Sequence, residues 1–132
     1  MTQQARGNFD VKVTPLEPHP WQQGGLGRMA LDKHYHGPLE GGSRGEMLTG
    51  GDYSKGSAGY VAMERFEGTL DGRQGGFALQ HNATMDQGRM LLNVVVVPGS
   101  GSGALQGING QMQIVAAGGK HTYVLEYNLP QA

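Results

Sequence analysis

The stretch GRMALDKHYHGPLEGGSRGEM, residues 27–47, decides how the chain folds. In its first half, apolar and polar residues alternate, which predicts a strand with one face toward a core. Its second half is rich in glycine, which permits positive φ angles and close backbone approach and therefore predicts a tight turn into another strand. The face predicted to point inward carries Met29, Leu31, Lys33 and Tyr35.

The same alternation recurs along the chain and indicates further half-buried strands. No window longer than about ten residues combines helical apolar spacing with freedom from glycine and proline, so we expect little or no helix. The other alternating segments are NFDVKVTP (8–15), GGFALQHN (75–82), GQMQIV (110–115) and KHTYVLEYNL (120–129).

A glycine repeat organises the connections. Each copy reads Gly-x-Leu-x-Gly and continues to Gly-x-Met or Gly-x-Phe, in GPLEGGSRGEM (37–47), GTLDGRQGGF (68–77) and GALQGINGQM (103–112). Each copy predicts the turn of a hairpin whose leucine packs inward, and three hairpins with a strand at each end make about eight strands. A phosphate-binding role is disfavoured, because phosphate loops lead into helices and these glycines lead into strands.

The composition restricts the classes of protein that this chain could be. Its 132 residues suit a single domain over 1–132. Its 10 Lys and Arg against 11 Asp and Glu offer no basic surface for nucleic acid or anionic lipid. The absence of cysteine excludes disulfides and thiolate chemistry. Since no apolar signal segment opens the chain, we expect a cytoplasmic protein with neither membrane nor nucleic-acid partners.

Two segments are expected to lie outside the strands. Residues 1–6 are expected to form a flexible N-terminus. Residues 14–26, TPLEPHPWQQGGL, contain three prolines and no periodicity, which predicts a loop. Its Trp21 could fold over the edge of the core or, alternatively, cover the mouth of a pocket.

Three long runs carry a resemblance to a known family. They are GRMALDKHYHGPLEGGSRGEML (27–48), KGSAGYVAMERFEGTLDGRQGGFALQHNATM (55–85), and GSGALQGINGQMQI (101–114) with KHTYVLEYNLP (120–130). Together they resemble a family of small bacterial proteins catalogued only as a domain of unknown function. The resemblance implies an all-β fold with one eight-stranded antiparallel barrel, similar to allene oxide cyclase and dirigent proteins. It also implies self-association, but no activity and no catalytic residues.

His34 and His36 raise the question of a metal. They share one strand face, a spacing that can chelate an ion when a third ligand arrives from a neighbouring strand. Their face is predicted to be the outer one, whereas the available third ligands, His81 and His121, are predicted to face inward. We therefore expect neither a metal nor a cofactor.

Lys33 and Tyr35 are predicted to face the interior. A lysine among apolar neighbours needs a carboxylate or a water-filled cavity, because an unpaired buried charge is costly. Glu46, Glu64 and Glu126 are the partners that the sequence offers. The group could be a structural ion pair between strands or, alternatively, a Lys/Glu/Tyr cluster that polarises a ligand.

His81, His121 and Tyr123 also occupy alternate positions that are predicted to face inward, and they could meet across the barrel. A histidine and a tyrosine there could exchange a proton with a carbonyl compound, although a satisfied core histidine is the plainer interpretation. The ligand-binding candidates are Lys33, Tyr35, Glu64, His81, His121 and Tyr123.

Two hypotheses follow from these patterns. In the first, the barrel binds an apolar or amphipathic small molecule and could act as a cofactor-free isomerase or cyclase. In the second, the barrel is a non-catalytic oligomeric module whose interior is fully packed. The run RMLLNVVVVPG (89–99) is apolar on both faces except at Asn93, and its residues Val94–Val97 would lie at a subunit interface. A cavity above about 300 Å³ reached by the polar candidates would favour the first hypothesis.

Overall fold

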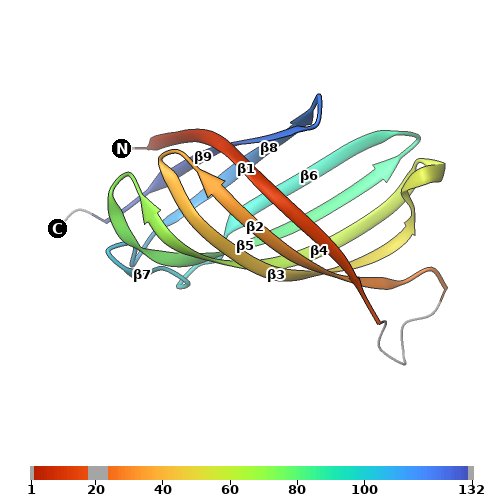
Figure 1. Ribbon diagram of the computed structural model, residues 1–132, viewed down its shortest axis with the longest axis horizontal. Coiled ribbons are helices and arrows are strands. Elements are labelled where there is room, and N and C mark those ends of the chain that lie inside the picture. Colours follow the sequence, from red (N-terminus) through yellow and green to blue (C-terminus); the bar gives the residue numbers. More distant parts are fainter. Residues whose placement is uncertain (1, 18–23, 131–132) are drawn as a thin grey trace.

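A computed structural model describes residues 2–17 and 24–130 (Figure 1). A single short 3-10 turn, η1 (Tyr53–Lys55), is the only helical element in this part of the chain. None of the described residues belongs to a helix long and apolar enough to span a bilayer. The strands are β1 (Gln3–Leu16), β2 (Gly27–His36), β3 (Leu39–Asp52), β4 (Ser57–Leu70), β5 (Arg73–Asp86), β6 (Arg89–Val96), β7 (Ser102–Gly103), β8 (Asn109–Ala117) and β9 (Lys120–Asn128).

Eight of these strands close into an antiparallel barrel, which confirms the predicted fold class. They follow the order β4-β3-β2-β1-β9-β8-β6-β5, and β5 pairs back onto β4. The short β7 adds to the end of β5. The seam between β6 and β8 is held by one paired position, Val95 with Gln111, so the barrel is least tightly closed there (Figure 1).

The inward faces are those that the alternation predicts. Phe9, Leu31, Leu79 and Leu125, each from a different strand, are buried in the interior. In β6 the inward Val94 and Val96 are buried, whereas the outward Val95 is 39% exposed. Within residues 2–17 and 24–130, therefore, nothing fully covers the outer face of this strand, for which a cover was predicted.

Two segment boundaries differ from the prediction. β1 begins at Gln3 and pairs with β9, and Ala5 within it is fully buried, so residues 3–6 are not flexible. In the sequence, the alternating pattern of residues 3–6 is short, and its one inward residue, Ala5, is small. The pattern therefore does not indicate a strand. Thr14–Leu16 still pair with β2, so the connection begins after Leu16 and not at Thr14. Trp21 lies outside the described residues.

The three glycine repeats lie at one end of the barrel and close it. Their leucines, Leu39, Leu70 and Leu105, are all fully buried, as the repeat predicts. They belong to one core cluster with rings and aliphatic side chains from β1, β2, β5, β6, β8 and β9, so this end has a solid core. The opposite end carries η1 together with the β5–β6 and β8–β9 turns (Figure 1).

Candidate functional site

The half of the barrel away from the glycine repeats is hollow. A cavity of about 270 Å³ lies inside it, slightly below the size expected of a ligand-binding barrel. The interior is thus packed at one end and hollow at the other, so neither of the two predicted interiors describes it fully. The lining is mainly apolar: Phe9, Val11, Val13, Leu31, Lys33, Met47, Tyr53, Tyr60, His81, Met90, Leu92, Ile114 and His121.

The carboxylate of Glu64 lies at the boundary between the hollow and packed halves. Its side chain is completely buried, and all four polar groups around it donate to it. Lys33 Nζ and His81 Nε2 each lie 2.6 Å from Oε2. Tyr35 donates its hydroxyl to Oε1 at 2.6 Å, and Ser43 donates to the same oxygen at 2.8 Å. This five-residue group is called the Glu64 network below.

The charge of Glu64 follows from these partners. Burial alone would raise its pKa, but the hydrogen bond from His81 and the positive charge of Lys33 outweigh burial and lower the pKa to about 2. Burial and the adjacent carboxylate raise the pKa of Tyr35 well above its ordinary value, so this phenol stays protonated and donates a hydrogen bond to Glu64. The network therefore contains an ionised carboxylate in an apolar interior.

The residue that pairs with Glu64 on the neighbouring strand is a glycine for a steric reason. Gly45 pairs with Glu64 across β3 and β4. A Cβ at this position would lie 1.8 Å from the carbonyl oxygen of Met63 and 2.7 Å from Cα of Glu64. Only glycine lets the two strands approach this closely, which places Ser43 and Lys33 within reach of the carboxylate.

His81 connects the network to the cavity. Since Glu64 is ionised, Nε2 of His81 carries the proton that is donated to it. Among the described residues, none forms a hydrogen bond with Nδ1. Since none of their buried side-chain nitrogens or oxygens is without a hydrogen-bond partner, Nδ1 is not a fully buried atom. Because His81 lines the cavity, Nδ1 is the nitrogen that the cavity exposes. The ring of Tyr60 packs near it, with the ring centroids 6.4 Å apart.

Lys33 lies beside His81 on the cavity wall. Its ammonium is 5.0 Å from the centroid of the Phe9 ring, within the range of a cation–π contact. Of the three carboxylates that the sequence offered, only Glu64 points inward. Glu46 is on the outer face and pairs with Arg28 at 2.7 Å, and Glu126 also lies on the outer face of β9.

The predicted cluster of His81, His121 and Tyr123 does not form. His121 does line the cavity, where its ring packs on Phe9 with centroids 5.2 Å apart. The hydroxyl of Tyr123 instead lies at the packed end, where it accepts from the N–H of Leu39 at 3.1 Å and donates to the carbonyl of His36 at 3.0 Å. Tyr123 is therefore a structural clamp on the β2–β3 turn.

The sequence prediction missed two participants. Ser43 donates to Glu64 but stood in a glycine-rich stretch that was assigned to turn chemistry. Tyr60 lines the cavity, and burial raises its pKa to about 12. Its inward parity with Glu64 was the signal that could have found it.

His34 and His36 face outward, as predicted, but their surroundings differ from the expectation. The nearest acidic groups are Glu40, across the β2–β3 turn, and Asp10 on β1. The prediction that a third metal ligand would have to be His81 or His121 is therefore wrong.

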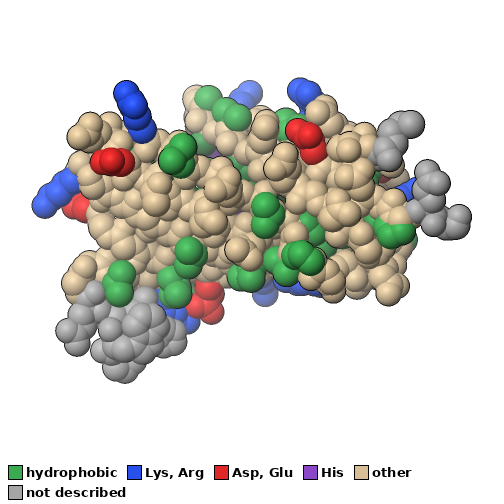
Figure 2. Space-filling view, turned by 180° about the vertical axis from the view of Figure 1, so that it is seen from behind, with side chains coloured by type: hydrophobic (Ala, Val, Ile, Leu, Met, Phe, Trp, Pro, Cys, Tyr) green, Lys and Arg blue, Asp and Glu red, His purple; other side chains and the backbone are tan. Residues whose placement is uncertain are grey.

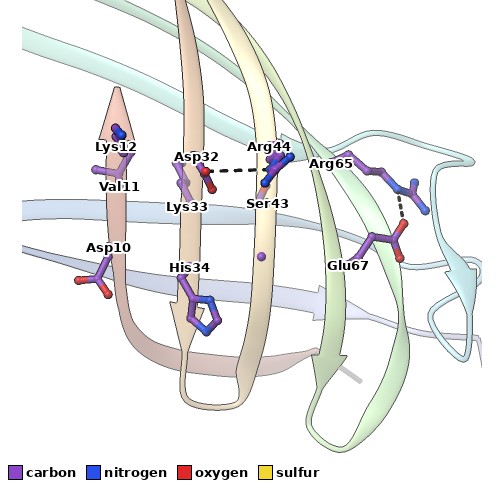
Figure 3. A pocket seen from close by; sticks show the side chains of 11 residues that line it. Asp10, Val11, Lys12, Asp32, Lys33, His34, Ser43, Arg44, Arg65 and Glu67 are labelled. Atoms are coloured by element: carbon purple, nitrogen blue, oxygen red, sulfur yellow. Dashed lines mark hydrogen bonds and ion pairs between the residues drawn. The ribbon is translucent and has the colours of Figure 1, made fainter. Parts of the chain in front are cut away.

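A larger hollow of about 640 Å³ lies outside the barrel, over β1 to β4 (Figure 3). Its two arginines are paired with neighbouring carboxylates: Arg65 lies 2.9 Å from Glu67, and Arg44 lies 4.0 Å from Asp32. It is an open surface with balanced charge, so the interior cavity over the Glu64 network is the better candidate site.

Comparison with known proteins agrees with this fold. Residues 5–127 match the family described as "Protein of unknown function (DUF3224)". A crystal structure of a protein with unknown function from this family, from Shewanella oneidensis MR-1, is 46% identical, covers 100% of both chains and has a TM-score of 0.92. No curated protein matches the chain. The chain therefore belongs to the DUF3224 family, and these relatives bring no assigned activity with them.

Proposed function

We propose that the hollow half of the barrel binds a small amphipathic molecule whose apolar body fills the cavity and whose carbonyl or hydroxyl end meets Lys33 and His81. The observation that carries this proposal is the ionised Glu64 network at the floor of an apolar cavity. Charged groups with a strongly shifted pKa inside a pocket are typical of functional sites.

A purely structural role accounts less well for the network. Replacing a buried ion pair by apolar residues of similar volume is often neutral or stabilising, so such a pair is weak support for stability alone. Here the network borders empty space, and two of its members, Lys33 and His81, are within reach of a guest.

The size of the cavity limits the ligand. Pockets for drug-sized molecules have volumes of roughly 300–1,000 Å³, and an apolar cavity of roughly 150 Å³ takes up benzene. A volume of about 270 Å³ therefore suits a molecule with one ring and a short polar substituent.

The chemistry that the site could perform needs no cofactor. Lys33 can stabilise negative charge that develops on a carbonyl oxygen, while Nδ1 of His81 can accept or return a proton on the adjacent carbon. Glu64 holds the imidazole in the tautomer that leaves Nδ1 free. An isomerisation or cyclisation of a carbonyl compound is the reaction class that fits these groups.

Acetophenone, which combines one ring with a carbonyl, is a suitable probe. Calorimetric titration of the native chain is expected to give saturable binding that Lys33→Met abolishes with the fold intact by circular dichroism. Lys12→Met is the matched control, because Lys12 is on the outer face of β1 and should leave binding unchanged. Equal binding by Lys33→Met and Lys12→Met, or none by the native chain, would contradict the proposal.

A second function, self-assembly, is favoured by a separate observation. An outer groove of about 630 Å³ across β3 to β6 exposes Leu48, Val61 and Leu91, and Leu91 is 74% exposed. Figure 2 views the molecule from the β5–β6 side and shows several hydrophobic side chains at the surface with few charges among them. Apolar side chains exposed along one groove often mark an interface.

We propose that a second copy of the chain covers this groove. The outward Leu91 and Val95 would contribute to it, whereas Val94 and Val96 of the predicted Val94–Val97 interface face the core. Native mass spectrometry is expected to give an oligomer that Leu91→Lys dissociates. A native chain that is monomeric at micromolar concentration would exclude this assembly.

A further inference from the structure

We propose that the outer surface of the β2–β3 hairpin binds a divalent transition-metal ion such as zinc, held by His34, His36 and Glu40 with Asp10 as a fourth ligand. This site is on the opposite side of the barrel wall from the cavity and is independent of the function proposed for the interior.

The strand register brings these four side chains together. Asp10 on β1 pairs directly with His34 on β2, and both point outward (Figure 3). Tyr35 pairs with Gly41, which places Glu40 near the start of β3 opposite His36 at the end of β2. Three strands thus contribute ligands to one patch.

The side chains already converge on one another. Residues two apart on a strand are separated by roughly 6.7 Å, yet the ring centroids of His34 and His36 lie 4.6 Å apart, so the rings lean together. One ligand atom from each of His34, His36 and Glu40 lies within 4.8 Å of the other two. His34 Nε2 is 2.9 Å from Glu40 Oε2, and His36 Nε2 is 2.9 Å from Asp10 Oδ2.

The donor set selects the class of metal. Imidazole nitrogens with carboxylate oxygens suit zinc, nickel and copper, whereas calcium and magnesium prefer oxygen ligands alone. Ligand atoms around a tetrahedral zinc are roughly 3.4 Å apart, given bond lengths of about 2.0–2.1 Å. The groups are partly exposed, so small rotations about their side-chain bonds suffice to reach that geometry.

The charge of the patch also favours a dication. With both histidines neutral, Glu40 and Asp10 supply two negative charges, which one divalent ion neutralises. The ion would replace two histidine–carboxylate hydrogen bonds that are open to water, and such exposed pairs are weak competitors.

Zinc titration by calorimetry, with the full chain at neutral pH, tests the proposal. We expect one ion per chain in a saturable isotherm, weakened at least about tenfold by His34→Gln, His36→Gln or Glu40→Gln. Glu46→Gln is the matched control, since Glu46 is an exposed carboxylate on the same strand as Glu40 and should leave the affinity unchanged. Circular dichroism checks that each variant remains folded.

Copper(II) supplies a second readout that identifies the ligands. Its electron paramagnetic resonance spectrum should show hyperfine coupling to two imidazole nitrogens, reduced to one in either histidine variant. The proposal is overturned if zinc fails to saturate the chain at millimolar concentration. It is equally overturned if His81→Gln removes binding while the His34 and His36 variants retain it.

Discussion

Replacing Glu64 by glutamine tests the electrostatics of the interior. The amide has nearly the same shape as the carboxylate but carries no charge and has one NH₂ end. Glu64 accepts two hydrogen bonds at each oxygen, from Tyr35 and Ser43 at one and from Lys33 and His81 at the other. Glutamine can preserve only one of these pairs, and its NH₂ would face two donors at the other end.

The cost can be worked out in two ways. The pKa of Glu64 falls from 4.5 to about 2, and at about 1.4 kcal/mol per pKa unit this corresponds to roughly 3 kcal/mol of stability. Removing one partner of a buried ion pair costs roughly 3–5 kcal/mol, because the other charge is left uncompensated. We therefore expect Glu64→Gln to lose about 3 kcal/mol in the free energy of unfolding at pH 7.

The pH dependence has a definite sign. Because the folded-state pKa of Glu64 is below the unfolded value, its contribution is fully present above about pH 4.5 and is lost as the pH falls through about 2. The stability gap between the native chain and Glu64→Gln should therefore narrow steadily from pH 5 to pH 2.

Urea unfolding followed by circular dichroism at several pH values measures this gap. Glu67→Gln is the control, because Glu67 is an exposed carboxylate on the same strand and should change stability by less than about 1 kcal/mol. A loss below about 1 kcal/mol for Glu64→Gln at pH 7, or a gap that does not change with pH, would refute the reasoning.

Two further substitutions test the packing around the site. Gly45→Ala places a Cβ 1.8 Å from the carbonyl oxygen of Met63, so it should lower the free energy of unfolding, measured in urea, by more than about 2 kcal/mol. Gly42→Ala is the control and should be nearly neutral, because the nearest atom to its Cβ would be 3.9 Å away. Similar losses for both variants would contradict the steric argument. Tyr123→Phe should lower the free energy of unfolding by about 1–2 kcal/mol, because it removes the hydrogen bonds to the β2–β3 turn. Acetophenone binding should not change. A loss of binding would instead place this tyrosine at the cavity.

The sequence predicts the barrel and its inward faces because alternation fixes which side of a strand each residue occupies. Lys33, Tyr35 and His81 were placed in the interior on this basis, and the repeat placed Leu39 and Leu70 there too. Parity does not give the height of a residue along the barrel axis, however. Height depends on the pairing register, which a single sequence does not specify.

This limit explains which site predictions did not hold. Tyr123 shares a face with His121, but the register places it at the packed end, beyond reach of the cavity. Alternation alone places Glu126 outward, between Leu125 and Tyr127. Bringing Glu64 to Lys33, however, needed the pairing of β2 with β3 and of β3 with β4. The approach of Glu40 to His36 depends on a turn of only two residues, which the glycine-rich stretch indicated without locating it.

We propose that the hollow half of the barrel admits a small molecule. Nuclear magnetic resonance of methyl-labelled methionines is the most direct test of this proposal. Met47 and Met90 line the cavity, Met112 lies in the packed core, and Met63 is on the outer face. On titration with acetophenone, we expect saturable chemical-shift changes at Met47 and Met90, whereas the signals of Met63 and Met112 should not change. Shifts at Met63 alone, or at none of the four, would contradict it.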